Sequence, residues 1–256
     1  MKQFLCKPKI LLSGIILVLL AVVPFVGAGG RYISGIIWPE PPVVTPGDGT
    51  APPSDAVVLF DGKGFEEWDG GEKQKVDDDG AFSIRGGMRT KKKFGDCQLH
   101  VEFATPEKVK GTGQQRGNNG IGLMGGRYEI QILDSYKNKT YFEGQCASVY
   151  NQRPPAVNAC RGPGEWQTFD IFFTAPRFEK DGKLKSPAYV SVVHNGVLVQ
   201  NHTELQGMTR YNRKPTYSKH GEREQLVLMY HGNQVRFRNI WIRDFAELQG
   251  KWPKKK

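Results

Sequence analysis

Two polar side chains, Glu129 and Gln131, alternate with apolar residues in a segment that otherwise has the composition of a β-strand. Successive strand residues point to opposite faces, so the two share one face, and Asp134 follows three residues later. A carboxylate can take up a proton and an amide can hold hydroxyl groups, which makes this face a candidate site for chemistry. Five glycines between positions 117 and 126 permit close approach to the backbone. The alternative is an ordinary polar sheet face that meets solvent.

A second group of candidate residues lies near the end of the chain. His231 titrates near neutral pH and can serve as a general base or a metal ligand. Arg236 and Arg238 share one face of the strand that follows, where they can bind hydroxyls or a developing enolate oxygen. Taken alone, this group fits better a surface strand with two solvated arginines and a capping histidine.

A third group, Tyr150-Asn151-Gln152, combines an aromatic ring with amides. Amides form paired hydrogen bonds to sugar hydroxyls, and rings cover the apolar faces of sugars. The alternative is a proline-rich loop braced by its amides. Tyr150 and Gln152 are therefore candidate substrate-binding residues, and Asn119 in the glycine-rich segment is another.

Nearly every structured segment of the chain has the pattern of a β-strand. Residues 98–103, 166–173 and 235–243 alternate in polarity and are rich in β-branched and aromatic residues, and Asn195-Gly196 predicts a tight hairpin turn. No stretch after the N-terminal region keeps a helical apolar period, so we expect an antiparallel β-sandwich or jelly roll. The predicted core consists of Leu99, Val101, Phe103, Ile130, Ile132, Phe169, Ile171, Val190, Val192, Val227 and Ile240.

The sequence divides into four parts. Residues 1–28 combine basic residues with an apolar run and small residues, which predicts a signal peptide, or an uncleaved membrane anchor. Residues 29–55 form a proline-rich linker that we expect to act as a spacer. Residues 56–246 form the sandwich domain, and residues 247–256 form a basic tail. We therefore expect an exported protein, periplasmic or secreted, that touches a membrane only through an uncleaved N-terminal segment.

Charge and cysteine content limit the classes of function. The net charge is +10, and removal of the three lysines in residues 1–28, a segment without acids, leaves +7. Export and strand-like aromatics argue against nucleic-acid binding. Cys146 and Cys160 flank a Pro- and Asn-rich loop, so a disulfide between them is expected in an oxidising compartment. No serine-hydrolase elbow, phosphate-binding loop, dinucleotide-binding fingerprint or zinc spacing is present.

An ordered set of motifs spans about residues 57–245 and resembles the 3-keto-disaccharide hydrolase family, which includes 3-keto-glucoside 1,2-lyase and 3-keto-2-hydroxy-glucal hydratase domains. The motifs are LFDGKGFEEW at 59–68, GNNGIGL at 117–123, YEIQILDS at 128–135, GQCASVY at 144–150, GEWQTFD at 164–170 and HGNQVRFRNIW at 231–241. The resemblance implies a concanavalin-like, jelly-roll antiparallel β-sandwich and a carbohydrate substrate.

The chemistry that the resemblance implies needs a base, an electrophile and an acid. A ketone at C3 of a glucosyl unit acidifies the C2 proton, whose removal leads to β-elimination of the C1 substituent. The resemblance implies this elimination, the addition of water to the glucal product, or both. Glu129 or His231 is the expected base, and Arg236 or a bound divalent cation the expected electrophile. Asp134 is an acid or an orienting group.

The resemblance implies four hydroxyl-binding residues, and the strand pattern adds Arg238. The candidate substrate-binding residues are therefore Asn119, Gln131, Tyr150, Gln152 and Arg238. A non-catalytic carbohydrate-binding module of the cell envelope is the alternative function, because the same sandwich hosts both kinds of protein.

Overall fold

The computed structural model describes residues 34–252, so the predicted signal segment lies outside the described residues. Within residues 34–252 the chain consists of β-strands, loops and three single-turn 3-10 helices: η1 (Gly71–Lys73), η2 (Gly113–Gln115) and η3 (Phe142–Gly144). No helix in this part of the chain is long and apolar enough to span a membrane. The predicted all-β class is confirmed.

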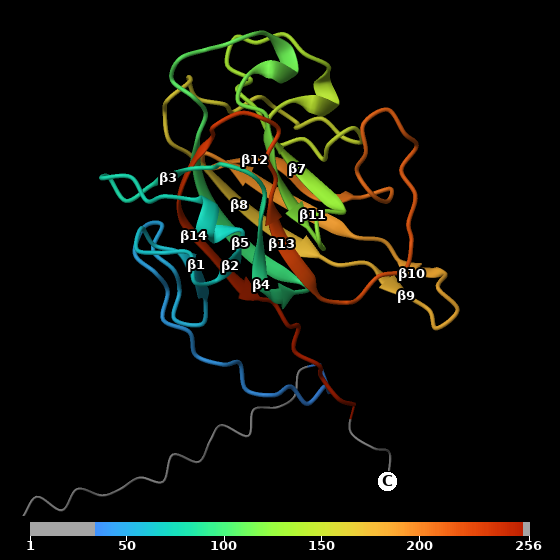
Figure 1. Ribbon diagram of the computed structural model, residues 1–256. Coiled ribbons are helices and arrows are strands. Elements are labelled where there is room, and N and C mark those ends of the chain that lie inside the picture. The colour runs from blue at the N-terminus through green and yellow to red at the C-terminus, as the bar shows by residue number, and fades with distance from the viewer. Residues whose placement is uncertain (1–33, 253–256) are drawn as a thin grey trace, which may run out of the picture. The chain divides into compact units, whose positions relative to one another are not determined.

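Two antiparallel sheets form the sandwich of the described residues (Figure 1). The seven-stranded sheet has the order β1 (Val57–Phe60), β14 (Arg236–Asp244), β5 (Cys97–Ala104), β8 (Gln167–Thr174), β11 (Tyr189–His194), β12 (Val197–Glu204), with β3 (Phe82–Ser83) beside β14. The five-stranded sheet has the order β2 (Trp68–Asp69), β4 (Met88–Phe94), β13 (Glu224–Leu228), β6 (Asn119–Leu123), β7 (Tyr128–Ile132). A small ribbon pairs β9 (Arg177–Phe178) with β10 (Leu184–Ser186).

The core fills the space between the two sheets with one alternate set of side chains from each strand. Every predicted core residue is buried except Val227, which is half-buried on the outer face of the five-stranded sheet. Its neighbours Leu226 and Leu228 point inward instead. Residues 226–229 are all apolar, so no alternation of polar and apolar residues shows which of them point into the core.

The proline-rich segment is not a spacer over its whole length. Residues 41–55 belong to the same compact unit as the sandwich. The Thr50 carbonyl accepts the indole N–H of Trp241 at 3.0 Å, and the Thr45 N–H donates to the Ser54 hydroxyl at 3.0 Å. Prolines limit pairing in a sheet but not packing over one, so this part of the linker prediction is wrong.

A second unit contains the described residues 34–40 and 248–252. Within it, Ile37 and Lys251 pair as an antiparallel bridge, so part of the predicted basic tail is paired.

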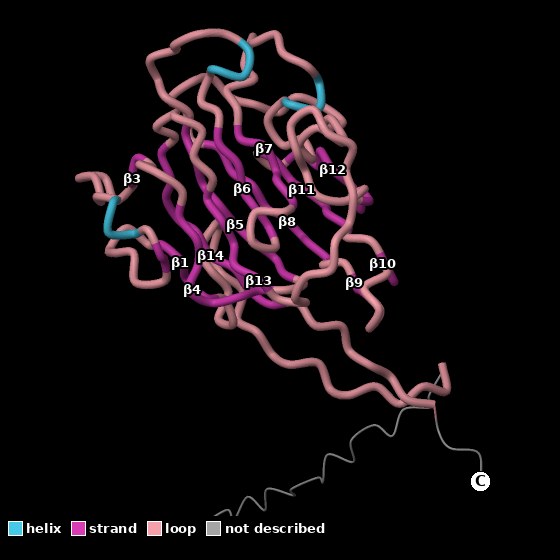
Figure 2. The backbone as a smooth tube through the Cα atoms, turned by 45° about the vertical axis from the view of Figure 1, so that its right-hand side comes forward, coloured by secondary structure: helices cyan, strands magenta, loops and turns pink. Residues whose placement is uncertain are grey.

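The long loops gather at one end of the sheets. Residues 105–118 and 133–166, which carry η2 and η3, lie together beyond the ends of β6 and β7 (Figures 1 and 2). Residues 147–150 continue the five-stranded sheet on the free side of β7, because the Gln131 N–H donates to the Ser148 carbonyl and the Tyr150 N–H donates to that of Glu129. These loops place their side chains beside the outer face of β7.

Candidate active site

Glu129 occupies the outer face of β7, as the alternation predicted. Its neighbours Tyr128 and Ile130 are fully buried in the core, whereas the Glu129 side chain is 9% exposed. A Cβ atom on Gly120 would lie 2.3 Å from Glu129 Oε1, so the carboxylate lies directly across the backbone of this glycine. One of the glycines noted in the sequence therefore makes room for the carboxylate itself.

His231 lies next to this carboxylate. Its Nε2 atom is 3.7 Å from Glu129 Oε1, and its side chain is 46% exposed. The hydrogen-bonding and charge of Glu129 raise the pKa of His231 above its ordinary value, against the opposing effect of burial. Glu129 and His231, which are 102 positions apart in the sequence, thus form an acid–base pair.

Asn119 holds the His231 loop in place and does not point outward. It is fully buried, and its side-chain amide donates to the Asn233 carbonyl at 2.9 Å. The Asn233 side chain in turn accepts the Gly117 N–H at 3.2 Å and donates to the His231 carbonyl at 3.3 Å. Asn119 was predicted to bind substrate, but its inward position on β6 gives it a positioning role.

Two tyrosine hydroxyls lie near the pair. Tyr150, a predicted binding residue, shares a hydrogen bond of 2.9 Å with Tyr141. Burial raises the pKa of both phenols, and the charge of Glu129 adds to the effect, so both keep their protons at neutral pH. Tyr141 was missed because no local pattern distinguishes it; only the path of the η3 loop brings it to Tyr150.

An amide cluster extends the site along β7. Gln131 donates from its amide nitrogen to Gln114 Oε1 and Asn118 Oδ1, both at 3.1 Å. Its own Oε1 is buried and has no hydrogen-bond partner among the described residues. Gln131 therefore has an acceptor free for a ligand, whereas Gln114 and Asn118 orient its amide.

Asp134 is not placed to act as an acid. Its carboxylate forms an ion pair with Arg116, whose Nε donates at 2.9 Å, and also accepts the Tyr136 N–H at 3.1 Å. The carboxylate is 3% exposed. We therefore assign Asp134 a structural role in place of the predicted catalytic or orienting one, because Arg116 and the Tyr136 N–H already occupy its carboxylate oxygens.

Arg236 and Arg238 form ion pairs with acids other than Glu129. Glu129 lies on β7 of the five-stranded sheet and the arginines lie on β14 of the seven-stranded sheet, whereas His231 lies in the connection between β13 and β14. Arg236 bonds Asp79 at 2.6 and 2.8 Å, and Arg238 bonds Glu102 at 2.6 Å. The sequence predicts that they join His231 at one site, but in the structure the two guanidinium groups pair with Asp79 and Glu102.

Gln152 and the two cysteines also have structural surroundings. The Gln152 amide donates to the Gly207 carbonyl at 2.9 Å and accepts the Gln206 N–H at 2.8 Å, which ties two loops together. Cys146 and Cys160 are free thiols in this structure, so the expected disulfide is not formed. Their side chains contact each other, which lowers the pKa of Cys160, while burial raises that of Cys146.

The described residues 34–252 contain no group of three or more His, Cys, Asp or Glu side chains arranged to hold a metal ion. Glu129 and His231 could supply two ligands at most, so the expected divalent cation remains a prediction and enters no step below.

Glu129 differs from the other buried acids of the described residues. Three carboxylates are buried there: Glu102, Glu129 and Asp134. Arginines form ion pairs with Glu102 and Asp134. Glu129, in contrast, has only His231 as a charged partner among the described residues. The fold and the site therefore define an antiparallel β-sandwich that presents a free carboxylate, an imidazole, two phenols and an amide on one outer sheet face.

A family model described as the 3-keto-alpha-glucoside-1,2-lyase-like domain matches residues 55–243, and the chain belongs to this family. A crystal structure of a protein from Parabacteroides distasonis ATCC 8503, called a putative glycosyl hydrolase, is 43% identical, covers 81% of this chain and 93% of that chain, and has a TM-score of 0.77. Another protein of that organism, with the same description, is 21% identical, covers 74% of this chain and 99% of that chain, and shares the fold with a TM-score of 0.55. Comparison with curated proteins gave no significant match.

Proposed function

We propose that this protein is a carbohydrate-active enzyme that cleaves 3-keto-glycosides by removal of the C2 proton and β-elimination of the C1 substituent, followed by hydration of the glucal product. The family description supports this substrate class, and the 43% identical protein described as a putative glycosyl hydrolase supports a carbohydrate substrate. The observation that carries the mechanism is the Glu129–His231 pair, with 3.7 Å between Oε1 and Nε2.

Glu129 is the proposed base. No arginine or lysine of the described residues neutralises its carboxylate, so only His231 competes with the C2 proton for its lone pairs. When this proton leaves, the electrons of the C2–H bond form the C2=C3 double bond of an enolate, and the C3 oxygen becomes negative. Proton abstraction next to a ketone is typical work for a carboxylate within hydrogen-bond reach of the carbon.

His231 is the proposed acid. Glu129 raises its pKa, which keeps the imidazole protonated at higher pH than an ordinary histidine. As the enolate collapses, the C1–O bond breaks, its electron pair leaves with the aglycone oxygen, and the imidazolium gives that oxygen a proton. Transfer of the proton from Glu129 to His231 then restores the pair, so the elimination cycle releases and takes up no net proton.

Neutral donors and acceptors complete the site. The Tyr141 and Tyr150 phenols keep their protons, so their hydroxyl pair can donate a hydrogen bond to the C3 oxygen as it becomes negative. The unpaired Oε1 of Gln131 can accept a sugar hydroxyl. This assignment replaces the arginine electrophile expected from the sequence, because the Arg236 guanidinium is paired with Asp79.

The direct test is the substitution Glu129→Gln, assayed with a 3-keto-glucoside by release of the aglycone and by ultraviolet absorption of the enone product. Turnover should fall by about 10²–10⁴-fold, the usual contribution of a general base. Glu107→Gln, an exposed acid outside the site, is the matched control and should retain full activity. Unchanged turnover in Glu129→Gln would remove this residue as the base.

The same assay separates the enzyme from a non-catalytic sugar-binding module. If the wild-type protein binds the 3-keto-glucoside but releases no aglycone, the binding module is the better description. Export is a further part of the proposal, and it rests on the basic and apolar pattern of residues 1–28. N-terminal sequencing of the mature protein from fractionated cells tests it, and cleavage near residue 28 is the expected result.

A further inference from the structure

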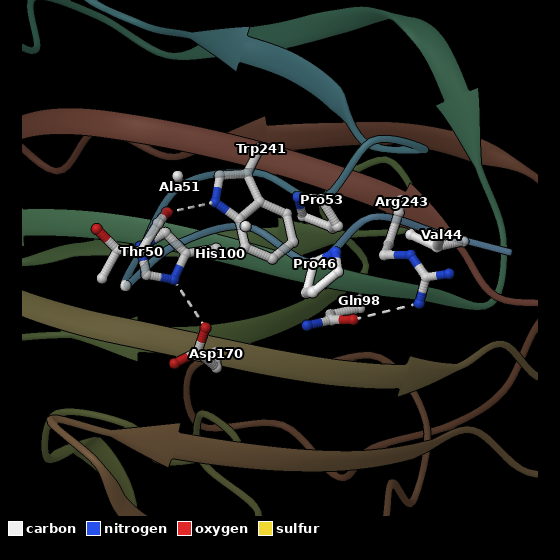
Figure 3. Close-up of a pocket in the computed structure, with 12 residues that line it drawn as sticks. Val44, Pro46, Thr50, Ala51, Pro53, Gln98, His100, Asp170, Trp241 and Arg243 are labelled. Carbon is white, nitrogen blue, oxygen red and sulfur yellow. Dashed lines mark hydrogen bonds and ion pairs between the residues drawn. The ribbon is translucent and has the colours of Figure 1, made fainter. Parts of the chain in front are cut away.

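A cavity of about 400 Å³ lies between residues 44–53 and the outer face of the seven-stranded sheet (Figure 3). Its sheet wall includes Trp241, His100 and Gln98, and Asp170 lies at its edge. Pro46 and the neighbouring apolar residues of the segment form the opposite wall. This volume falls in the lower part of the range typical of small-molecule sites, roughly 300–1,000 Å³.

The segment that closes the cavity is anchored by specific bonds. Thr50 accepts the Trp241 indole N–H through its carbonyl at 3.0 Å, and its hydroxyl donates to Glu102 at 3.1 Å. Asn239 donates to the same carbonyl at 3.0 Å. The wall is therefore a fixed part of the sandwich unit and gives the cavity a defined shape.

Hydrogen-bonding capacity remains free inside this cavity. Asp170 uses Oδ1 to bond His100 Nδ1 at 2.7 Å, and its Oδ2 has no partner among the described residues. Gln98 Oε1 accepts a hydrogen bond of 3.5 Å from Arg243, and the Gln98 amide nitrogen has no partner among the described residues. The cavity thus offers one acceptor and one donor, together with proline and indole rings.

The charges around the cavity cancel. Burial lowers the pKa of His100, but Asp170 and Glu102 outweigh it and raise that pKa to about 9, so the imidazole is positively charged. Asp170 compensates this charge, and Asp55 compensates Arg243 with two contacts of 3.0 Å. A charged ligand would leave a charge unpaired here, whereas a neutral ligand would not.

We propose that this cavity is a second, non-catalytic binding site for a single neutral sugar ring. Sugar hydroxyls both donate and accept, which matches the free Asp170 oxygen and the free Gln98 amide, and the C–H face of a sugar ring packs on proline and indole. The site lies on the sheet opposite to Glu129, so it does not depend on the proposed catalysis.

Titration of ¹⁵N-labelled protein with methyl glucoside, followed by NMR, tests this site. The Trp241 indole N–H and the Gln98 side-chain amide should shift in a saturable way. Glucuronate, which has the same ring with a carboxylate, should bind at least about fivefold more weakly, because its charge has no free partner. No saturable shift at these groups, or equal binding of both sugars, would overturn the proposal.

Variants separate this site from the Glu129 site. Gln98→Leu and Asp170→Leu should each weaken methyl glucoside binding at least about fivefold, since each removes a hydrogen bond to the ligand. Gln225→Leu, an amide on the five-stranded sheet, is the matched control. Glu129→Gln should leave binding here unchanged, and Gln98→Leu should leave turnover unchanged. Binding that persists in both Gln98→Leu and Asp170→Leu refutes the site.

Discussion

The two outer faces of the sandwich carry nearly the same pair of groups in different surroundings. On the five-stranded sheet His231 Nε2 lies 3.7 Å from Glu129 Oε1, and on the seven-stranded sheet His100 Nε2 lies 3.7 Å from Glu102 Oε1. The His231 side chain is 46% exposed, whereas that of His100 is 2% exposed. Residue type and spacing are therefore insufficient to distinguish a reactive pair from a structural one.

The difference lies in what else the carboxylate bonds. Arg238, Asn239 and Thr50 donate to Glu102 at 2.6, 2.8 and 3.1 Å. Burial acts to raise the pKa of Glu102, but its partners outweigh this effect and lower the pKa to about 2. Glu129 has no such donors among the described residues. A carboxylate with unused lone pairs can accept a substrate proton, and one that is fully bonded stabilises the fold.

Exchanging each acid for its amide gives the largest expected contrast. Glu129→Gln should abolish most turnover, as stated above, and change the free energy of unfolding by less than about 1 kcal/mol. Glu102→Gln should preserve turnover but lower that free energy by about 2–4 kcal/mol, because it disrupts a buried ion pair. Urea unfolding and the enone assay on the same preparations check both; a Glu102→Gln protein as inactive as Glu129→Gln would show that the contrast is false.

Gly120→Ala is expected to give a smaller effect on the Glu129 side. The added Cβ would lie 2.3 Å from Glu129 Oε1, so the carboxylate must move away from its position beside His231. Displacement of this kind can reduce kcat/KM by up to about 100-fold. Gly87→Ala is the matched control, since its nearest contact would be 3.5 Å. Steady-state kinetics should show a loss only in the first variant.

The pH dependence of stability should report His100. Its pKa in the folded protein is about 9, above the value of about 6.5 for an unfolded histidine. The stabilisation is therefore complete below about pH 6.5 and is lost as the pH rises towards 9. A pKa difference of this size corresponds to about 3 kcal/mol. Urea unfolding at pH 6 and pH 9 measures the loss.

The His100→Gln variant provides the control for this measurement, because its stability should change much less between the two pH values. NMR titration of the histidine ring signals compares the two faces directly. His231 should titrate above an ordinary histidine in the wild-type protein and lower in Glu129→Gln, since Glu129 raises its pKa. A His231 titration that is unaffected by Glu129→Gln would contradict the proposed acid–base pair.

Sequence patterns predicted correctly those structural features that depend on residues close together in the chain. The alternation in residues 128–132 placed Glu129 and Gln131 on the face opposite to the core, and the structure confirms this. The same kind of reasoning gave no sign that Arg236 and Arg238 would pair with Asp79 and Glu102, acids far away in the sequence. It also failed for Val227, whose apolar run has no alternation, and it gave no signal for Tyr141.

The sequence by itself determined the β-sandwich and the family, because strand alternation and ordered motifs are local properties of the chain. Only the tertiary structure decided which acid stays free. Arg238 reaches Glu102 across 136 positions, and Arg116 reaches Asp134 across 18. Such pairings depend on how strands and loops meet in space, so the separation of a reactive carboxylate from a structural one arises only in the folded protein.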